Sequence, residues 1–260
     1  MEEGAIVEAA EMLWRARREG RLLTALPESC RPRSLAEGYA VQDTMAARSG
    51  QAVIGWKIAA TSEAGQRHIG VSEPLAGRLF ADFVLADGAE IAARPLLMRV
   101  IEAEFAFRMG RDLPPRGKPY EAAEAVAAAD GLHLAIEVPD ARFERFAEAG
   151  PPQIAADDAF AAWFVLGPAL GDWRRLDLPR QEVRVTRNGS PAGEGRGANV
   201  LGDPRLALAW IANERAARGA GLKAGEIVTT GTCLTPVPIG PGDRMVATFA
   251  GLGEVRVAFT

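Results

Sequence analysis

Acidic residues lie inside two short apolar stretches of this 260-residue chain, residues 101–107 (IEAEFAF) and 134–140 (LAIEVPD). Alternate side chains of a strand point to the same face, so Glu102 and Glu104 would lie side by side, about 6 to 7 Å apart. Glu137 is a third acid, in an equally apolar strand. Buried ionised carboxylates without a partner are so unfavourable that they normally shift their pKa, form ion pairs or coordinate a metal. If these strands are buried, the fold has to compensate the charges of the three glutamates.

A hard divalent cation is one way to compensate three neighbouring carboxylates. An all-oxygen ligand set selects magnesium, manganese or calcium over zinc or copper. The alternative is an exposed edge strand whose glutamates are merely solvated, which is the commoner origin of an isolated E-x-E pair. The third acid, and the scarcity of basic residues in both stretches, favour the cation site.

The composition limits the classes of protein and of ligand. With 260 residues, 48% of them hydrophobic, the chain is long enough for one large domain or two modest ones. A net charge of -4, with acids and bases mixed along the chain, offers no basic surface for nucleic acid and no polybasic patch for a membrane. The first residues show neither a signal-peptide pattern nor a bilayer-spanning apolar run, which predicts a cytoplasmic protein.

The two cysteines, Cys30 and Cys233, stand far apart and form no C-x-x-C pair. This pattern supports neither a disulfide framework nor a thiolate zinc site. Cys233 lies in a Gly/Thr-rich turn and is a minor candidate for a nucleophile, since only His68 and His133 are available as a base. Both histidines are expected to be surface or packing residues rather than ligands.

The chain is predicted to begin with a small helical unit. Apolar residues recur with helical spacing over residues 5–18, and Ser34 and Glu37 have the spacing of a capping box at the start of a second helix. After this unit, short apolar runs broken by glycine predict many short strands. We therefore expect a helical unit at residues 1–50 and a β-rich domain at residues 51–260, in an α+β fold.

Three helices and one hairpin are expected within the β-rich domain. The helices are predicted at residues 120–129, 141–150 and 204–218. Asn188 and Gly189 follow an alternating apolar and polar run, a pattern typical of a two-residue hairpin turn.

Two further polar residues lie within apolar strands. Lys57 stands between Trp56 and Ile58, so its side chain points away from the face that these two residues occupy. This pattern alone favours a solvent-facing lysine on a half-exposed strand. Asp82 is embedded in a second apolar run, GRLFADFVLADG.

Several motifs occur together in one order. They are GWKIAATS, IEAEFAF followed by RDLP, AIEVPDARF, NGSPAGEG, LGDPRLALAWIANERAARGAGLKAGEIVTTG and PVPIGPGDRMVATFAGLGEVRVAF. In these motifs the chain resembles the 2-keto-4-pentenoate hydratase / 4-oxalocrotonate decarboxylase branch of the fumarylacetoacetate hydrolase superfamily. The resemblance covers nearly the whole chain after the first helix.

The resemblance implies a fold, a cofactor and site residues. The fold would be a mixed β-roll with a small N-terminal helical unit, assembled into homo-oligomers, and residues 51–260 would be its catalytic domain. A Mg²⁺ or Mn²⁺ ion would be bound by Glu102, Glu104 and Glu137. Lys57 and Asp82 match the active-site lysine and aspartate of the branch, and Thr232 matches a turn that lines its substrate pocket.

One departure from the branch concerns the substrate pocket. Where the branch typically has Asp-Asn-Ala-Ser-Ser-Ala, residues 157–162 read DDAFAA. Asp158 would add negative charge where an amide is usual, and Phe160 replaces a hydroxyl with a ring that cannot hydrogen-bond a carboxylate or a water. We therefore expect Asp158 and Phe160 to face the substrate and to alter its selection.

The function implied by the resemblance is a metal-dependent hydratase that acts on a small anionic, unsaturated 2-oxo acid in the breakdown of aromatic compounds. The first alternative is a decarboxylase of a 2-oxo dicarboxylic acid of the 4-oxalocrotonate type. A second is an acylpyruvate hydrolase, which needs a water activated by a histidine–acid pair, and His68 has no acid suitably placed beside it. A third is a non-catalytic partner subunit, which the altered run at residues 157–162 would mark.

Overall fold

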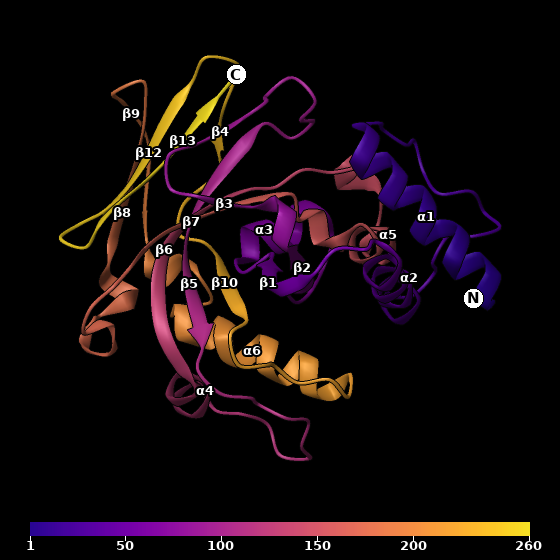
Figure 1. The fold of residues 1–260 in the computed structure, drawn as a ribbon, viewed down its shortest axis with the longest axis horizontal. Helices are drawn as coiled ribbons and strands as arrows, with labels where there is room; N and C mark the ends of the chain where they lie inside the picture. Colours follow the sequence, from indigo (N-terminus) through magenta and orange to yellow (C-terminus); the bar gives the residue numbers. More distant parts are fainter.

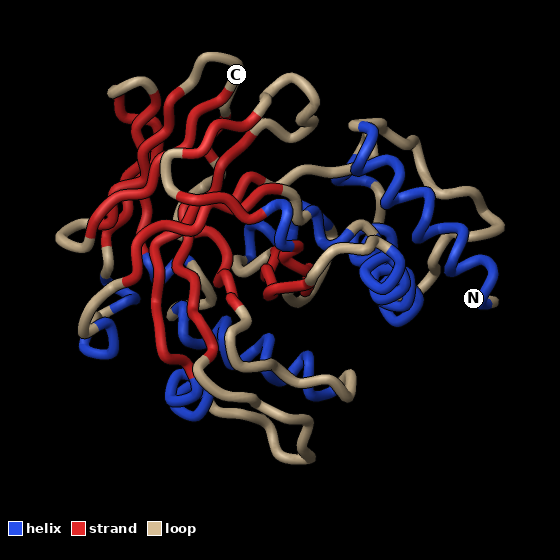
Figure 2. Tube along the Cα trace, viewed as in Figure 1, coloured by secondary structure: helices blue, strands red, loops and turns tan.

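Two helices open the chain in this computed structural model, which describes residues 1–260. Helix α1 spans Glu3–Glu19 and helix α2 spans Leu35–Arg48. The predicted cap of α2 is confirmed, because the Ser34 hydroxyl accepts a hydrogen bond from the backbone N–H of Glu37 at 3.2 Å. With α5 (Pro151–Ala156), these helices form a group beside the strands (Figures 1 and 2).

The larger of two sheets has eight strands, in the order β2-β1-β10-β5-β6-β7-β3, with β11 paired to β5. Its strands are β1 (Val53–Ala59), β2 (Leu75–Phe80), β3 (Val84–Ala86), β5 (Val100–Met109), β6 (Ala129–Val138), β7 (Trp163–Ala169), β10 (Ile227–Thr232) and β11 (Val237–Pro238). Strands β5, β6 and β10 are central and mostly buried. Strand β5 therefore lies in the interior of the protein. It is not the exposed edge strand that was the alternative explanation for its glutamates.

The smaller sheet has five strands in the order β4-β13-β12-β8-β9. Its strands are β4 (Ala89–Ile91), β8 (Glu182–Arg187), β9 (Ser190–Arg196), β12 (Arg244–Phe249) and β13 (Gly253–Phe259). The predicted hairpin joins β8 to β9, and Asn188 and Gly189 both have positive φ, 54° and 81°, as a type I′ turn requires. The two sheets meet through residues such as Phe105 and Phe249, whose ring centroids lie 5.1 Å apart.

The remaining helices are short, apart from one. They are α3 (Glu63–Ile69), α4 (Ala122–Ala128) and α6 (Pro204–Ala217), with single 3₁₀ turns that include η1 (Ala81–Phe83), η2 (Phe146–Glu148) and η3 (Asp158–Phe160). The predicted helices at 120–129 and 204–218 are confirmed as α4 and α6. The helix predicted at 141–150 is wrong, because only the turn η2 forms there.

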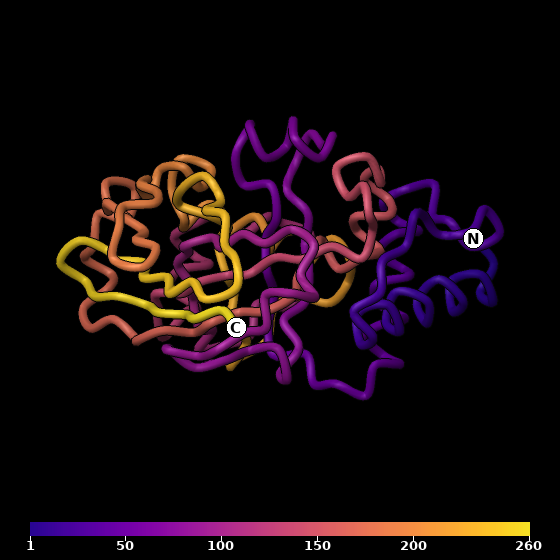
Figure 3. Tube along the Cα trace, turned by 90° about the horizontal axis from the view of Figure 1, so that it is seen from above, coloured from indigo at the N-terminus to yellow at the C-terminus, as the bar shows by residue number.

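The N-terminal helices and the strands share one hydrophobic core. Ala9 and Leu13 of α1 belong to the same buried cluster as Phe105 of β5 and Phe249 of β12. Figure 3 shows the helical group beside the strands when the molecule is turned. None of the helices combines the length and the apolar character that a membrane span requires. A domain boundary near residue 50 stays a prediction.

Candidate active site

The three predicted glutamates converge on one point of the larger sheet. Strands β5 and β6 pair antiparallel with Glu102 directly opposite Glu137, and Glu104 lies two residues further along β5. One oxygen from each carboxylate lies within 4.8 Å of the others. Glu104 and Glu137 are buried, whereas Glu102 keeps partial exposure. The register of one strand pair therefore brings together acids that are more than thirty positions apart in the chain.

Lys57 joins this cluster from β1. Its Nζ lies 3.0 Å from Glu137 Oε1 and donates a hydrogen bond to the backbone carbonyl of Ala159 at 2.9 Å. The Lys57 side chain is only 3% exposed, so the solvent-facing lysine that the local pattern favours is not what forms. Burial alone would lower the pKa of Lys57, but the surrounding carboxylates, Glu137 foremost, hold that pKa above its usual value.

Strand β10, between β1 and β5, supplies a further contact that the sequence did not reveal. The backbone N–H of Gly231 donates to Glu104 Oε2 at 2.9 Å, at an irregularity in the β10–β5 register. Gly231 has a φ of +92°, and a Cβ at this position would overlap the side chain of Thr61. Only glycine fits this place without strain, and it orients one oxygen of the Glu104 carboxylate.

The donor set of this cluster fits a hard divalent cation. Glu104 Oε1 and Glu137 Oε2 are buried and have no hydrogen-bond partner within the protein, which is costly for a carboxylate oxygen. Burial, with the charge of Glu137, raises the pKa of Glu102 to about 7 and that of Glu104 well above its usual value. Once all three carboxylates are deprotonated, as metal binding requires, they and the Lys57 ammonium leave two negative charges, which a divalent cation would neutralise.

Residues 157–162 lie against the cluster in an unusual backbone conformation. Asp158, Ala159 and Phe160 all have positive φ, of 57°, 49° and 63°, and none is glycine. Each such residue costs on the order of 1–3 kcal/mol and persists only where its surroundings hold it. The carbonyl of the middle residue, Ala159, is the one that accepts the hydrogen bond from Lys57.

Asp158, which was predicted to face the substrate, is bound by groups of the protein itself. It is fully buried; its Oδ1 accepts a hydrogen bond from the backbone N–H of Arg78 at 2.8 Å, and its Oδ2 lies 3.2 Å from Arg17 Nη1. Both oxygens are therefore occupied by groups of the protein. Phe160 is 4% exposed and packs edge-on against Phe146, with 5.7 Å between ring centroids.

The structure does not bring Asp82 to the cluster. Asp82 lies in the turn η1, is exposed, and forms no hydrogen bond or ion pair. In the β1–β2 pairing Gly77 is opposite Lys57 and Phe80 is opposite Val53, so the chain runs away from Lys57 before it reaches Asp82. Asp82 is exposed although its sequence neighbours are apolar, because the chain forms a surface turn at this residue.

Thr232 lies beside the cluster. It is the register partner of Glu104 across the β10–β5 pair and is half-buried. Its hydroxyl donates to the carbonyl of Leu234 at 2.7 Å and so helps to shape the turn after β10.

Neither cysteine nor histidine takes part in the cluster. Burial raises the pKa of the Cys233 thiol, which argues against the minor prediction of a nucleophile at this position. His133 Nδ1 lies 3.1 Å from the carbonyl of Gly167, and His68 packs near Phe146 with ring centroids 6.0 Å apart. His68 is an exposed surface residue and His133 is half-buried, as the prediction of surface or packing residues expects, and neither forms a histidine–acid pair at the glutamates.

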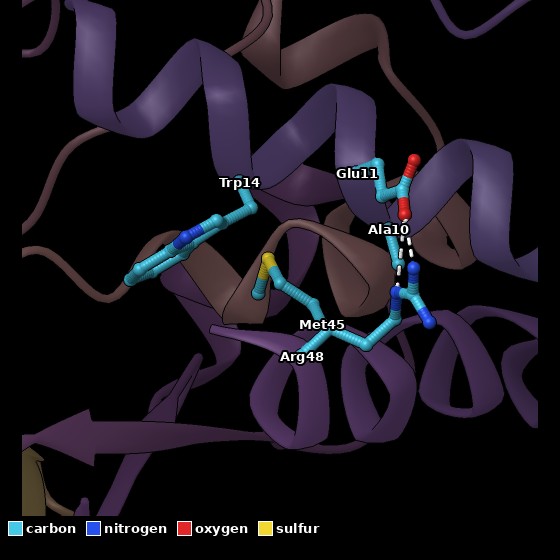
Figure 4. A pocket seen from close by; sticks show the side chains of 5 residues that line it. All are labelled: Ala10, Glu11, Trp14, Met45 and Arg48. Carbon is cyan, nitrogen blue, oxygen red and sulfur yellow. Dashed lines mark hydrogen bonds and ion pairs between the residues drawn. The ribbon is translucent and has the colours of Figure 1, made fainter. Parts of the chain in front are cut away.

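A surface pocket between α1 and α2 is separate from this site. It is lined by Ala10, Glu11, Trp14, Met45 and Arg48, none of which belongs to the acidic cluster. Figure 4 shows the ion pair across it, in which Arg48 Nε donates to Glu11 Oε1 at 3.1 Å. The pocket's polar side chains thus pair with each other.

Comparison with known proteins gives matches over nearly the whole chain. The Fumarylacetoacetate (FAA) hydrolase C-terminal family matches residues 60–260. A protein of Pseudomonas putida strain F1 named TodF product hydratase is 34% identical over 259 residues, which cover 98% of this chain and 96% of the relative. A 2-keto-4-pentenoate hydratase of Burkholderia vietnamiensis strain G4 is 32% identical over 266 residues, covering 100% of this chain and 99% of the relative. Among solved structures, 4-oxalocrotonate decarboxylase from Pseudomonas putida G7, complexed with magnesium and adipate, has a TM-score of 0.93 and 29% identity, covering 100% of this chain and 99% of that chain.

Proposed function

Because this chain belongs to the fumarylacetoacetate hydrolase family, we propose that it is a divalent-metal-dependent lyase that adds water to a small unsaturated 2-oxo acid in the breakdown of aromatic compounds. The motif resemblance and the mixed β-roll fold predicted from it are confirmed. Hydratases that match nearly the full chain support hydration as the reaction. The observation that carries the proposal is the convergence of three glutamates and a buried lysine on one point.

We assign Glu102, Glu104 and Glu137 as the residues that hold the cation. Magnesium is our first choice, since magnesium is bound in the solved decarboxylase, and manganese is a second that the same oxygen ligands would accept. The bound ion would supply a Lewis acid for the 2-oxo carboxylate of the substrate. The backbone N–H of Gly231 would keep Glu104 oriented, because it fixes the Oε2 atom and leaves Oε1 free.

Lys57 is the residue that we propose to move the proton. Its Nζ is buried, lies 3.0 Å from a glutamate of the cluster and is held by the Ala159 carbonyl. A proton carried at this atom would reach a substrate bound at the cation site, and the enclosed position would keep bulk solvent away from the proton transfer. We give Asp82 no role, since its exposed position does not support the prediction that it is the active-site aspartate. Thr232 and Phe160, beside the cluster, stay as predicted pocket residues.

The test is an absorbance assay with a conjugated 2-hydroxy-dienoate. Loss of the conjugated absorbance with Mg²⁺, without release of carbon dioxide, and its suppression by a chelator, would support hydration. Release of carbon dioxide from a 2-oxo dicarboxylate would instead support the decarboxylase, the second candidate, which rests on the likeness to the solved decarboxylase. Tight Mg²⁺ binding without turnover of any 2-oxo acid would contradict both reactions and leave the partner subunit.

We also propose a homo-oligomer in the cytoplasm. A row of partly exposed aromatic side chains, Trp14, Phe83 and Trp163, supports a second copy as partner, with centroids 6.5 Å apart for Trp14 and Phe83 and 4.9 Å for Phe83 and Trp163. Two free, buried cysteines agree with a reducing compartment. Light scattering after size-exclusion chromatography would decide the assembly, and a mass equal to one chain would contradict it.

A further inference from the structure

Arg17 of helix α1 lies outside the residues that the family matches, 60–260. Its side chain is nevertheless only 5% exposed and reaches the backbone that contacts Lys57. We propose that Arg17 is a positioning residue for Lys57 and acts through the left-handed residues 158–160. This inference rests on the proposed role of Lys57 in proton transfer.

The guanidinium group of Arg17 is bound by polar groups of the protein and by two aromatic rings. Its Nη1 lies 3.2 Å from Asp158 Oδ2, and its Nη2 donates to the carbonyl of Ala161. Its guanidinium carbon also lies 5.3 Å and 4.8 Å from the ring centroids of Phe80 and Phe83. One side chain therefore binds the residues on either side of the Ala159–Phe160 pair and is itself fixed by two aromatic rings.

The connection from Arg17 to Lys57 passes through one residue. Ala159 follows Asp158, and its carbonyl accepts the hydrogen bond from Lys57 Nζ at 2.9 Å. Asp158 is also seated against Gly77, the strand partner of Lys57, where a Cβ would overlap the Asp158 carbonyl. Because no glycine relieves the left-handed backbone at 158–160, the conformation depends on these external contacts. A shift of Asp158 would move the carbonyl that holds Lys57.

The charges in this region show what Arg17 contributes beside Arg142. Asp157 is bound by Arg142, through its side chain and through its backbone N–H, the latter at 2.9 Å. Arg142 also donates to the Ala161 carbonyl at 3.2 Å and so shares that contact with Arg17, but Arg17 is the cation paired with the Asp158 side chain. Loss of Arg17 would leave a fully buried carboxylate unpaired, whereas joint loss of both charges would leave none.

A compensation experiment follows from this pairing, with Arg17→Met, Asp158→Asn and the double variant, in the presence of Mg²⁺. Arg18→Met is the matched control, since Arg18 neighbours Arg17 on α1 but is exposed and unpaired. We expect Arg17→Met to lower kcat by about tenfold or more, because small misplacements of reacting groups have large effects on rate. KM and Mg²⁺ affinity should change little, and the double variant should recover most of kcat. Equal losses in Arg18→Met, or no recovery in the double variant, would overturn the proposal.

A second readout does not depend on activity. The chain has three lysines, of which Lys118 and Lys223 are exposed and Lys57 is buried. Pulse acylation with an amine-reactive ester, read by peptide mass spectrometry, should show faster labelling of Lys57 in Arg17→Met and unchanged labelling of the other two. If the wild type turns over no dienoate, the proposed function fails, but this labelling still decides whether Arg17 positions Lys57.

The milder variant Arg17→Gln covers the case in which Arg17→Met does not fold. Glutamine removes the charge but keeps a donor for the Ala161 carbonyl. Faster labelling of Lys57 in a folded Arg17→Gln protein, shown by an unchanged circular dichroism spectrum, would support the proposal. Labelling of Lys57 at the wild-type rate in every folded Arg17 variant would refute it.

Discussion

The two oxygens of Glu104 lie in different surroundings. Oε2 accepts the backbone N–H of Gly231 at 2.9 Å, whereas Oε1 is buried without a partner. A side chain fixed through one oxygen and unsatisfied at the other is arranged to bind a ligand through the second. Replacement of Glu104 therefore tests whether the cluster is a metal centre or whether Glu104 is an ordinary buried acid.

Glu104→Gln should abolish activity and weaken Mg²⁺ binding by more than about 100-fold, because it removes one charged oxygen ligand while nearly keeping the shape. Isothermal titration calorimetry with Mg²⁺ measures the affinity, and the dienoate assay measures the activity. Glu90→Gln, at an exposed glutamate of β4, is the control and should leave both unchanged. Normal turnover in Glu104→Gln would remove this residue from the ligand set.

Lys57→Met is expected to separate binding from chemistry. The methionine keeps an apolar stem of similar length but carries no proton, so kcat should fall by about 10²- to 10⁴-fold, the usual contribution of a general acid or base. Mg²⁺ affinity should persist, since the three glutamates are untouched. Lys223→Met, at an exposed lysine, is the matched control. If turnover survives in Lys57→Met, the proton must move through another group.

At the scale of the element, the irregular end of β10 determines how the Glu104 carboxylate is held. Gly231→Ala should lower both thermal stability and Mg²⁺ affinity, because the new Cβ would overlap Thr61 and displace the N–H that binds Glu104. Gly225→Ala is the control, since Gly225 also has a positive φ, of +86°, but open space around it. That control should lose only about 1 kcal/mol of unfolding free energy or somewhat more, without a change in Mg²⁺ affinity. Equal effects of the two variants on Mg²⁺ binding would show that β10 does not position Glu104.

Elements with local signals were predictable from the sequence, and elements without them were not. The Ser34 cap and the Asn188–Gly189 turn are fixed by their own side chains or backbone preferences, and both are confirmed. Helices α3 and α5 have seven and six residues, too few for a helical period to show, and they were not predicted. Helix α4 is as short as α3, but its alanine-rich sequence made it predictable.

In the site, too, features with a local sequence signal were predictable and features without one were not. That Glu102 and Glu104 share a face is a property of one strand, and it could be predicted. The burial of Lys57 depends on β10 lying between β1 and β5, and the burial of Asp158 depends on an arginine 141 positions away in the chain. Such nonlocal packing leaves no local pattern, which is why the strand pattern alone favoured a solvent-facing Lys57. The predicted roles of Lys57, Asp82 and Asp158 came instead from the family resemblance.

At the scale of the whole molecule, the acidic cluster makes the stability of the folded protein depend on pH. The pKa of Glu102, raised by burial to about 7 from 4.5, means that the metal-free folded protein binds a proton that the unfolded chain has already released. Between these pH values the folded state holds more protons, so its stability falls as the pH rises. A bound divalent cation replaces the proton and removes this loss.

Mg²⁺ should therefore stabilise the protein more at pH 8 than at pH 5. At a concentration 100 times its Kd, a ligand adds about 2.7 kcal/mol to the unfolding free energy. For a chain of this length, that corresponds to a rise in Tm of roughly 5 to 10 °C. Thermal unfolding with Mg²⁺ and with chelator at several pH values measures the difference, and Glu104→Gln should show almost none at any pH. A Mg²⁺ effect that is the same at pH 5 and pH 8, or larger at pH 5, would mean that the ion does not compete with protons for these glutamates.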